Sequence, residues 1–279
     1  MSKQKIKIAH SPDSDDAFMF YALQTGKITS DKYEFEIERR DIEELNQIAK
    51  DQIYDISAIS IHAYAHLADK YILTKTGCSM AEKNYGPTLV SLKEISKEEI
   101  GDKTIAVPGL WTTAYLILKL INPDFKPKPM PFDQIMDAVL DQEVDAGLLI
   151  HEGQLQFEDE GLKHVLTITE EWKNMAGDLP LPLGGNAIKK SLGPQVVKDL
   201  ADLQRESIQW AMNNPEEARD YARSFKRDLS AEEADKYLSW YANDRILNMG
   251  EDGVQAIEFI LGKAYELGVV NQNVKLELI

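Results

Sequence analysis

The sequence contains a single cysteine, Cys78, among its 279 residues. One cysteine cannot form an internal disulfide, so nothing in the chain indicates an oxidising compartment. The surrounding segment TKTGCSM contains no base that would activate the thiol, and Cys78 is therefore a weak candidate nucleophile. The chain also lacks an apolar signal-peptide region and any stretch long enough to cross a membrane, so we expect a cytoplasmic protein.

Basic residues are scarce. The sequence has 31 Lys and Arg against 47 Asp and Glu, which gives a formal net charge of −16. An acidic protein is a poor partner for nucleic acid or for an anionic membrane surface, and we expect neither. The expected partner is a small-molecule substrate. If that substrate is an anion, local dipoles rather than the overall field must hold it.

Several catalytic signatures are absent from the sequence. It has no GxSxG, no phosphate-binding P-loop, no GxGxxG after a strand and no HExxH. His62 and His66 have the i, i+4 spacing that places two histidines on one helical face, but no third ligand follows at a recognisable spacing. We therefore expect no metal and no cofactor, and an enzyme built on this chain would act by proton transfer.

Strand and helix patterns alternate through the first 150 residues. Apolar or alternating segments predict strands at 5–11, 33–41, 54–61, 103–109 and 145–150. Amphipathic segments predict helices at 15–28, 42–52, 112–121 and 133–141, and the proline-rich segment 122–132 predicts a loop. Alternation of this kind is typical of parallel βαβ units.

One ten-residue pattern occurs twice. DQIYDISAIS begins at Asp51 and DQEVDAGLLI begins at Asp141, each after an amphipathic helix and each with an Asp just before an apolar strand. The repeat suggests two α/β halves of similar construction. The alternative is that any helix–turn–strand unit has this pattern.

The chain becomes helical from about Gln195. An α/β body followed by such helices predicts a periplasmic-binding-protein-like type II fold, in which two α/β domains enclose a ligand cleft. We expect the chain to cross between domains near residues 89–93 and 183–187. The first domain would comprise residues 1–91 and 187–279, and the second residues 92–186.

The segment DAGLLIHEGQ ends a buried strand on His151 and Glu152. In an open sheet the carboxyl ends of the strands face the ligand crevice, and histidine is the commonest side chain for proton transfer near neutral pH. His151 is therefore the candidate catalytic residue. The alternative is a hydrogen-bonded structural histidine. We expect Glu152 to orient or solvate rather than to act.

Candidate binding groups also follow strands. Thr112 or Thr113 begins a helix, whose free amides attract a carboxylate, although simple N-capping is the alternative. Ser57 and Ser60 carry hydroxyls near the end of the strand 54–61. The loop SPDSDDAF, residues 11–18, contains three aspartates, of which Asp15 or Asp16 would cap a helix and repel anions.

Six segments occur in the order found in one enzyme family: SPDSDDAFMFYAL, HAYA, YGPTLV, VPGLWTTAYLILKL, DAGLLIHEGQ and LPLPLGG. Over nearly its whole length the chain resembles the 1,4-dihydroxy-6-naphthoate synthases of the futalosine route of menaquinone biosynthesis. A sister family, chorismate dehydratase, shares the fold but not the histidine motif. The resemblance implies a type II binding-protein fold. It also implies conversion of cyclic dehypoxanthinyl futalosine to 1,4-dihydroxy-6-naphthoate without metal or organic cofactor.

The resemblance also implies residue roles, with His151 corresponding to the family's proton acceptor. The positions that it assigns to substrate contact are Ala58, Ile59, Ser60, Thr113 and Ala114. The leading hypothesis is therefore a cofactor-free, lyase-type enzyme that abstracts a proton. The alternatives are a non-catalytic cytoplasmic small-molecule-binding protein of the same fold, or an enzyme of this fold with a different substrate.

The chain departs from that family around the predicted pocket. Asp13, Ser14, Asp15 and Ala17 stand where the family usually has Cys, Pro, Asn and Thr, while Ala58 and Leu110 stand where it has basic residues. Two cations are missing and two anions are gained, which disfavours a carboxylate substrate by a few kcal/mol per lost ion pair. The alternative is that these aspartates cap the first helix and point to solvent.

Overall fold

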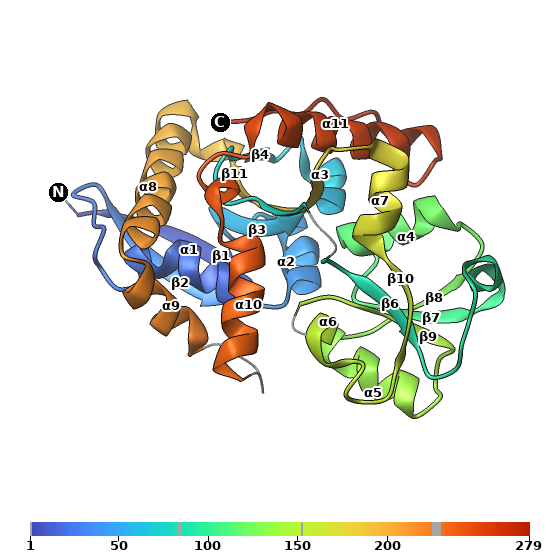
Figure 1. Ribbon diagram of the computed structural model, residues 1–279. Coiled ribbons are helices and arrows are strands. Elements are labelled where there is room, and N and C mark those ends of the chain that lie inside the picture. Colours follow the sequence, from blue (N-terminus) through green and yellow to red (C-terminus); the bar gives the residue numbers. More distant parts are fainter. Residues whose placement is uncertain (1, 83–84, 152, 225–229) are drawn as a thin grey trace.

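The computed structural model describes residues 2–82, 85–151, 153–224 and 230–279, which form two mixed β-sheets lying side by side (Figure 1). The first sheet contains β1 (Gln4–His10), β2 (Tyr33–Arg39), β3 (Ile56–Ser60), β4 (Tyr71–Leu73), β5 (Ser79–Ala81) and β11 (Leu181–Lys189). The second contains β6 (Thr88–Ser91), β7 (Thr104–Val107), β8 (Lys126–Pro129), β9 (Ala146–Leu149) and β10 (Lys163–Thr167).

The pairing within each sheet combines parallel and antiparallel strands. In the first sheet the order is β2-β1-β3-β11-β4, with β5 also on β11; β1 is parallel to β2 and β3, and β11 is antiparallel to its neighbours. In the second sheet the order is β10-β6-β9-β7-β8, with β7 parallel to β8 and β9. Strands β1, β3, β7 and β9 end at a common cleft, and the chain passes between the sheets from β5 to β6 and from β10 to β11.

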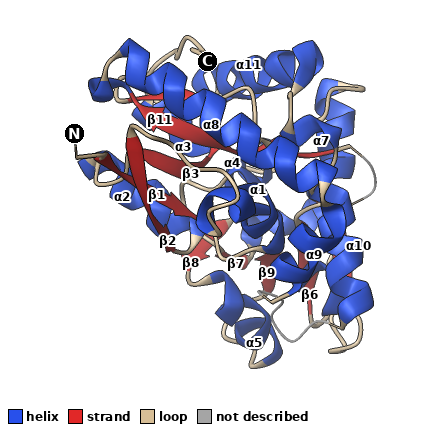
Figure 2. Cartoon of the chain, turned by 90° about the vertical axis from the view of Figure 1, so that its left-hand side faces the viewer, coloured by secondary structure: helices blue, strands red, loops and turns tan. Residues whose placement is uncertain are grey.

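Helices cover the outer faces of both sheets (Figure 2). Those from the first half of the chain are α1 (Ser14–Gln24), α2 (Ile42–Ile48), α3 (Ile61–Leu67), α4 (Thr113–Ile121) and α5 (Ile135–Leu140). The remainder are α6 (Gly153–Gln156), α7 (Ile168–Ala176), α8 (Pro194–Asn213), α9 (Pro215–Arg223), α10 (Ala231–Tyr241) and α11 (Gly250–Glu266). Short 3-10 turns lie at Ala49–Asp51, Lys97–Asp102, Phe132–Gln134, Lys190–Leu192 and Asp244–Ile246. No helix in the described ranges is long and apolar enough to span a membrane.

The prediction of a loop over 122–132 is wrong, because Lys126–Pro129 forms the strand β8. Strand β8 lies at the edge of the second sheet beside β7, and an edge strand tolerates proline because one side of its backbone needs no partner. The strands also change sheet before both predicted crossings. Strand β6 already pairs in the second sheet, and β11 already pairs in the first. The division of the chain into two domains at residues 91 and 187 remains a proposal.

The repeated DQ segments have the same backbone features in both sheets. Gln52 and Gln142 both adopt a left-handed conformation, with φ of 53° and 58°, directly before their strands. Asp55 then accepts a hydrogen bond from the amide of Lys7, and Asp145 accepts one from the amide of Thr104. Strands β3 and β9 are therefore equivalent elements, and each leads toward the cleft.

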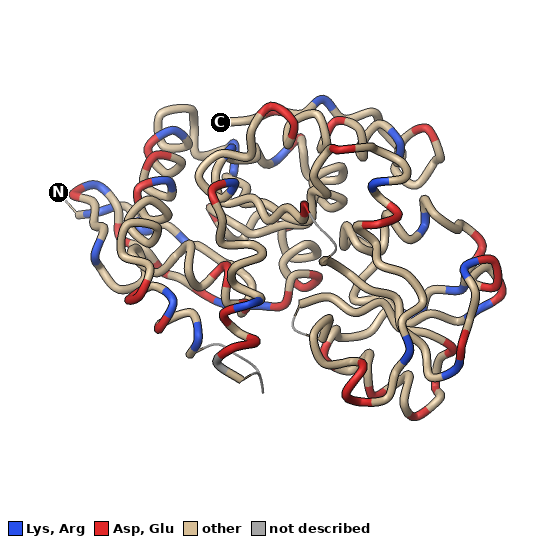
Figure 3. Tube along the Cα trace, in the orientation of Figure 1, with Lys and Arg blue, Asp and Glu red and all other residues tan. Residues whose placement is uncertain are grey.

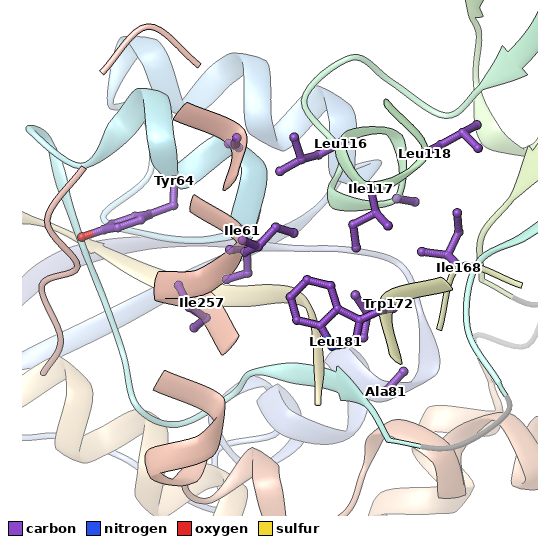
Figure 4. Packing of buried hydrophobic residues seen from close by; sticks show 14 of the residues in the cluster. Ile61, Tyr64, Ala81, Leu116, Ile117, Leu118, Ile168, Trp172, Leu181 and Ile257 are labelled. Carbon is purple, nitrogen blue, oxygen red and sulfur yellow. The ribbon is translucent and has the colours of Figure 1, made fainter. Parts of the chain in front are cut away.

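One hydrophobic core joins the two sheets. It combines Ile61 of α3, Ile117 of α4, Trp172 of α7 and Ile257 of α11, all buried and packed together in Figure 4. Helices α3 and α11 follow strands of the first sheet or pack on it, while α4 and α7 belong to the chain that builds the second sheet. The sheets are thus fixed to one another along one side of the cleft.

Close packing of α5 on β9 gives a stability prediction. A Cβ on Gly147 would lie 2.6 Å from Ile135 Cγ2 and 2.7 Å from Val139 Cγ2, both on branched side chains that cannot easily move away. We expect Gly147→Ala to lower the free energy of unfolding by about 1–3 kcal/mol, measured by urea denaturation. Gly262 in α11 is the control, because a Cβ there meets nothing within 4 Å. Gly262→Ala should raise stability by about 0.5–1 kcal/mol. Equal effects of the two variants would contradict this packing.

Candidate active site

A cavity of about 710 Å³, its opening to solvent included, lies where the chain leaves the carboxyl ends of β1, β3, β7 and β9. Eight of the predicted site residues line it: Asp15, Ala58, Ile59, Ser60, Thr112, Thr113, Ala114 and His151. Further polar residues line it that the sequence did not single out as site residues: Ser11, Asp16, Ser79, Gln154, Tyr237 and Tyr241. Residues from both sheets therefore surround one space, which is suited to a small ligand.

The ring of His151 lines this cavity and is held by a carboxylate. Its Nδ1 lies 2.8 Å from Oδ2 of Asp13, and the side chains are 14% and 4% exposed. The ring of Phe132 meets it edge to face at a centroid distance of 4.7 Å. The backbone of His151 is left-handed, with φ of 56°, a conformation that is uncommon for residues other than glycine, although histidine adopts it more often than most. Glu152, which we expected to orient or solvate, lies outside the described residues.

The aspartate loop between β1 and α1 is buried. Ser11 donates its hydroxyl to Asp13 at 2.7 Å and its amide to Asp16 at 2.7 Å. The prediction that Asp15 or Asp16 caps the helix is wrong, because α1 begins at Ser14. The alternative that the aspartates point to solvent is also wrong, since all three are almost fully covered. These carboxylates are covered because the segment that carries them lines the cavity.

Burial neutralises part of this acidic loop. Burial, together with the neighbouring Asp13, raises the pKa of Asp15 to about 6 against the opposing effect of a hydrogen bond from Ser79 at 2.8 Å. Burial likewise raises the pKa of Asp16 to about 8, with Asp15 adding to the effect. At neutral pH Asp16 is mainly a neutral carboxylic acid, so the loop carries less negative charge than its sequence implies.

The two predicted contact stretches adjoin in the cavity lining, where the amide of His62, two residues after Ser60, donates to the hydroxyl of Thr113 at 3.2 Å. Thr112 caps α4 by accepting a hydrogen bond from the amide of Tyr115 at 3.3 Å, while the hydroxyl of Thr113 donates to the carbonyl of Leu183 at 2.6 Å. On β3, Ser60 accepts a hydrogen bond from the side chain of Asn46 at 3.0 Å. Both stretches are therefore anchored by side-chain bonds of their own.

Ser57 does not line the cavity, contrary to prediction. It is fully buried, and its hydroxyl donates to the carbonyl of Ala58. Side chains alternate along a strand, so Ser57 and Ser60 cannot lie on the same face of β3. Leu110, 39% exposed, also lies outside the cavity lining, whereas Ala58 is part of it. Of the two positions where cations are missing, only Ala58 can affect a bound ligand directly.

Two tyrosines from the C-terminal part of the chain complete the lining. Tyr237 and Tyr241 lie on the same face of α10, with ring centroids 5.0 Å apart. Burial raises the pKa of Tyr241, so its phenol stays protonated and can donate a hydrogen bond. The i, i+4 spacing of these aromatics was visible in the sequence, but only the fold shows that α10 packs against the strand ends.

Neither His62–His66 nor Cys78 forms a chemical centre. The histidine rings lie 5.5 Å apart, His62 faces the carbonyl of Thr112, and His66 stacks on Trp111. Within the described ranges no three metal-ligating side chains gather. Burial raises the pKa of Cys78 to about 12, which leaves the thiol protonated and poorly nucleophilic.

The raised pKa of Asp16 predicts an unusual pH dependence of stability. Its pKa is about 8 when folded against 3.8 in the reference state, so the folded state binds more protons over that interval and loses stability as pH rises through it. We expect Asp16→Asn, which can keep the bond from Ser11, to remove a loss of about 1 kcal/mol per pH unit between about pH 5 and about pH 7.

The measurement is urea denaturation of both proteins at several pH values, and the slope of their difference decides the outcome. Asp199→Asn is the control, because Lys32, Gln195 and Tyr33 lower the pKa of Asp199 to about 2 and it is ionised in both states over this range. Parallel curves for wild type and Asp16→Asn would show that Asp16 is ionised in the folded protein.

Solved structures share this fold. A crystal structure of a protein from Archaeoglobus fulgidus is 47% identical, covers 95% of this chain and 98% of its own, and superposes with a TM-score of 0.88. The alkanesulfonate-binding protein of Xanthomonas axonopodis pv. citri is only 10% identical, with a TM-score of 0.74 over 99% of this chain and 98% of its own. The second similarity shows the fold alone, which is the periplasmic-binding-protein-like fold predicted from the sequence.

Sequence comparison identifies the family. A 1,4-dihydroxy-6-naphthoate synthase of Thermus thermophilus is 32% identical over 266 residues, covering 95% of this chain and 96% of that protein. An enzyme of the same name from Streptomyces coelicolor is 33% identical over 276 residues, covering 97% and 96%. The sequence profile of the family described as menaquinone biosynthesis matches residues 6–266. This chain therefore belongs to the menaquinone biosynthesis family.

Proposed function

We propose that this chain is a 1,4-dihydroxy-6-naphthoate synthase that acts on cyclic dehypoxanthinyl futalosine, with His151 as proton acceptor. The observation that carries the proposal is the ring of His151 in the cavity wall, with its Nδ1 on the carboxylate of Asp13. The two relatives that bear this enzyme name support the naphthoate product, and the substrate is the one that the family resemblance implies. As in the family that the chain resembles, the proposed reaction uses no metal or organic cofactor. We propose that it takes place in the cytoplasm.

The proposed chemistry is general-base catalysis. An imidazole whose Nδ1 donates to a carboxylate accepts a proton at Nε2, and the imidazolium that forms is stabilised by the same carboxylate. The proton leaves a carbon of the substrate, whose electron pair stays in the substrate. General bases of this kind contribute about 10²- to 10⁴-fold in rate.

Substrate binding relies on neutral groups. Within the described residues, the lining contains no lysine or arginine; in Figure 3 these residues lie mainly on outer helices and loops. A substrate carboxylate would instead meet the free amides at the start of α4, at Thr113 and Ala114, and the hydroxyl of Ser60. The same lack of cations favours a second candidate function, which is an enzyme of this fold with a more polar, less anionic substrate.

Replacement of His151 tests the proposed base. Asparagine suits the left-handed backbone of this position better than alanine, so His151→Asn leaves the fold intact. We expect kcat to fall about 100-fold or more while the dissociation constant of the naphthoate product changes little, because only proton transfer is lost. Product formation is followed by liquid chromatography and mass spectrometry, and binding by calorimetry.

The control is His164→Asn. His164 lies on β10, where its ring contacts the hydroxyl of Thr167 outside the cavity, and its replacement should leave the rate unchanged. A His151→Asn variant that loses binding as much as rate would assign His151 to substrate binding. A wild-type protein that forms no naphthoate would reject this substrate.

Adding a cation to the cavity tests how the ligand is recognised. We expect Ala58→Lys to strengthen binding of the naphthoate product by about 1–3 kcal/mol, because it provides an ion pair in a partly dry site, and Asp15→Asn to act in the same direction. The gain should shrink with added salt if the open site is wet. Leu110→Lys is the matched control, since it adds the same charge outside the cavity. Equal dissociation constants for wild type and Ala58→Lys would mean that the ligand carboxylate does not approach β3.

A further inference from the structure

The two partners of the His151–Asp13 pair come from different sheets. Asp13 follows β1 of the first sheet and stands directly before α1, whereas His151 follows β9 of the second. Their side chains meet across the cavity at 2.8 Å, and both are largely buried. In Figure 1 the two sheets lie side by side, and the contact between Asp13 and His151 joins the segments that follow them.

We propose that Asp13 is a positioning residue that fixes the ring orientation and tautomer of His151 from the opposite side of the cleft. The proposal rests on the proposed function of His151 as proton acceptor. Asp13 does not touch the reacting atoms; it acts through the imidazole. The chain resembles a family that usually has cysteine at this position, so the carboxylate is a feature of this protein rather than of the family motif.

The placement of Asp13 favours this role over helix capping. An aspartate at the N-cap position normally accepts a backbone amide of the first helical turn, which stabilises a helix by about 1 kcal/mol. Asp13 occupies the N-cap of α1 but makes no such bond with its side chain. Its Oδ2 instead receives the hydroxyl of Ser11 at 2.7 Å and Nδ1 of His151 at 2.8 Å. Asp13 thus forms no capping hydrogen bond to α1, and its carboxylate contacts the ring of His151 instead.

The backbone of His151 indicates the same constraint from the other side. His151 has a φ of 56°, which few residues other than glycine adopt and which the surrounding structure must hold. Phe132 contacts one side of the ring and Asp13 holds Nδ1. The uncapped position of Asp13 and the left-handed backbone of His151 therefore meet at a single contact between the two side chains.

Several other titratable groups surround the pair. They are Asp15 and Asp16 of α1, Asp41 at the N-cap of α2, His10 of β1 and Tyr241 of α10. Asp41 Oδ1 accepts the amides of Glu43 and Glu44, and His10 is held on the carbonyl of Ser11. Asp41 caps its own helix through Oδ1, and its buried Oδ2 has no hydrogen-bond partner among the described residues. Asp13 contacts the ring of His151 directly.

The test uses the tautomer of His151 in addition to activity. The chain has five histidines, whose ring nitrogens are observed by NMR in protein labelled with ¹⁵N-histidine. The set of signals that is lost in His151→Asn belongs to the ring of His151. We expect wild type to carry its ring proton on Nδ1 at high pH, and Asp13→Asn and Asp13→Ala to lose that preference. In the assay both variants should lower kcat about 100-fold with KM within about threefold. The acidic limb of the pH–rate profile should also move to lower pH, because removal of a carboxylate disfavours imidazolium.

The control is Asp199→Asn, which removes an aspartate–lysine pair far from the cavity and should change neither readout. A ring proton on Nε2 in wild type, or an unchanged tautomer and rate in both Asp13 variants, overturns the proposal. If wild-type protein makes no naphthoate, the proposed function fails. The nitrogen signals then still decide whether Asp13 orients the ring.

Discussion

The structure depends on two sets of strand ends that face each other across one cavity. Strands β3 and β9 are built alike, down to the left-handed glutamine and the strand-leading aspartate, and each delivers its next residues to the cleft. A shared core of α3, α4, α7 and α11 fixes the sheets on one side. The Asp13–His151 pair joins them across the opening. Because neither sheet alone contains both partners, the chemistry of His151 is a property of the assembled molecule.

The cavity separates the charge of the sequence from the charge of the site. A protein of net charge −16 with three aspartates beside its ligand space would repel an anion. Burial shifts that balance, because it keeps Asp16 mainly neutral at pH 7 and raises the pKa of Asp15 toward neutrality. Asp13 is in contact with the ring of His151. The aspartates that replace neutral residues of the family motif therefore add less negative charge to the site than their number implies.

Much of the fold could be predicted from periodicity, since strands β1, β2, β3 and β9 and helices α4 and α8–α11 have patterns that match their burial. Strand β8 was missed because its prolines suit an edge position that only the sheet order reveals. Strand β11 begins with Leu-Pro-Leu-Gly-Gly, which does not predict a strand, and it forms through pairing with β3, β4 and β5. At the site, His151 could be predicted because it directly follows a buried strand. No local pattern reveals that Asp13 contacts it or that Tyr241 lines the same cavity.

The central claim is that this cavity is where a naphthoate is formed beside His151. A crystal structure of the protein with 1,4-dihydroxy-6-naphthoate tests it most directly. The account predicts the product in the cavity between the two sheets, with a ring carbon in contact with His151, the carboxylate near the start of α4, and the Asp13–His151 pair intact. Product bound elsewhere, or bound in the cavity with its rings turned away from His151, would contradict the account.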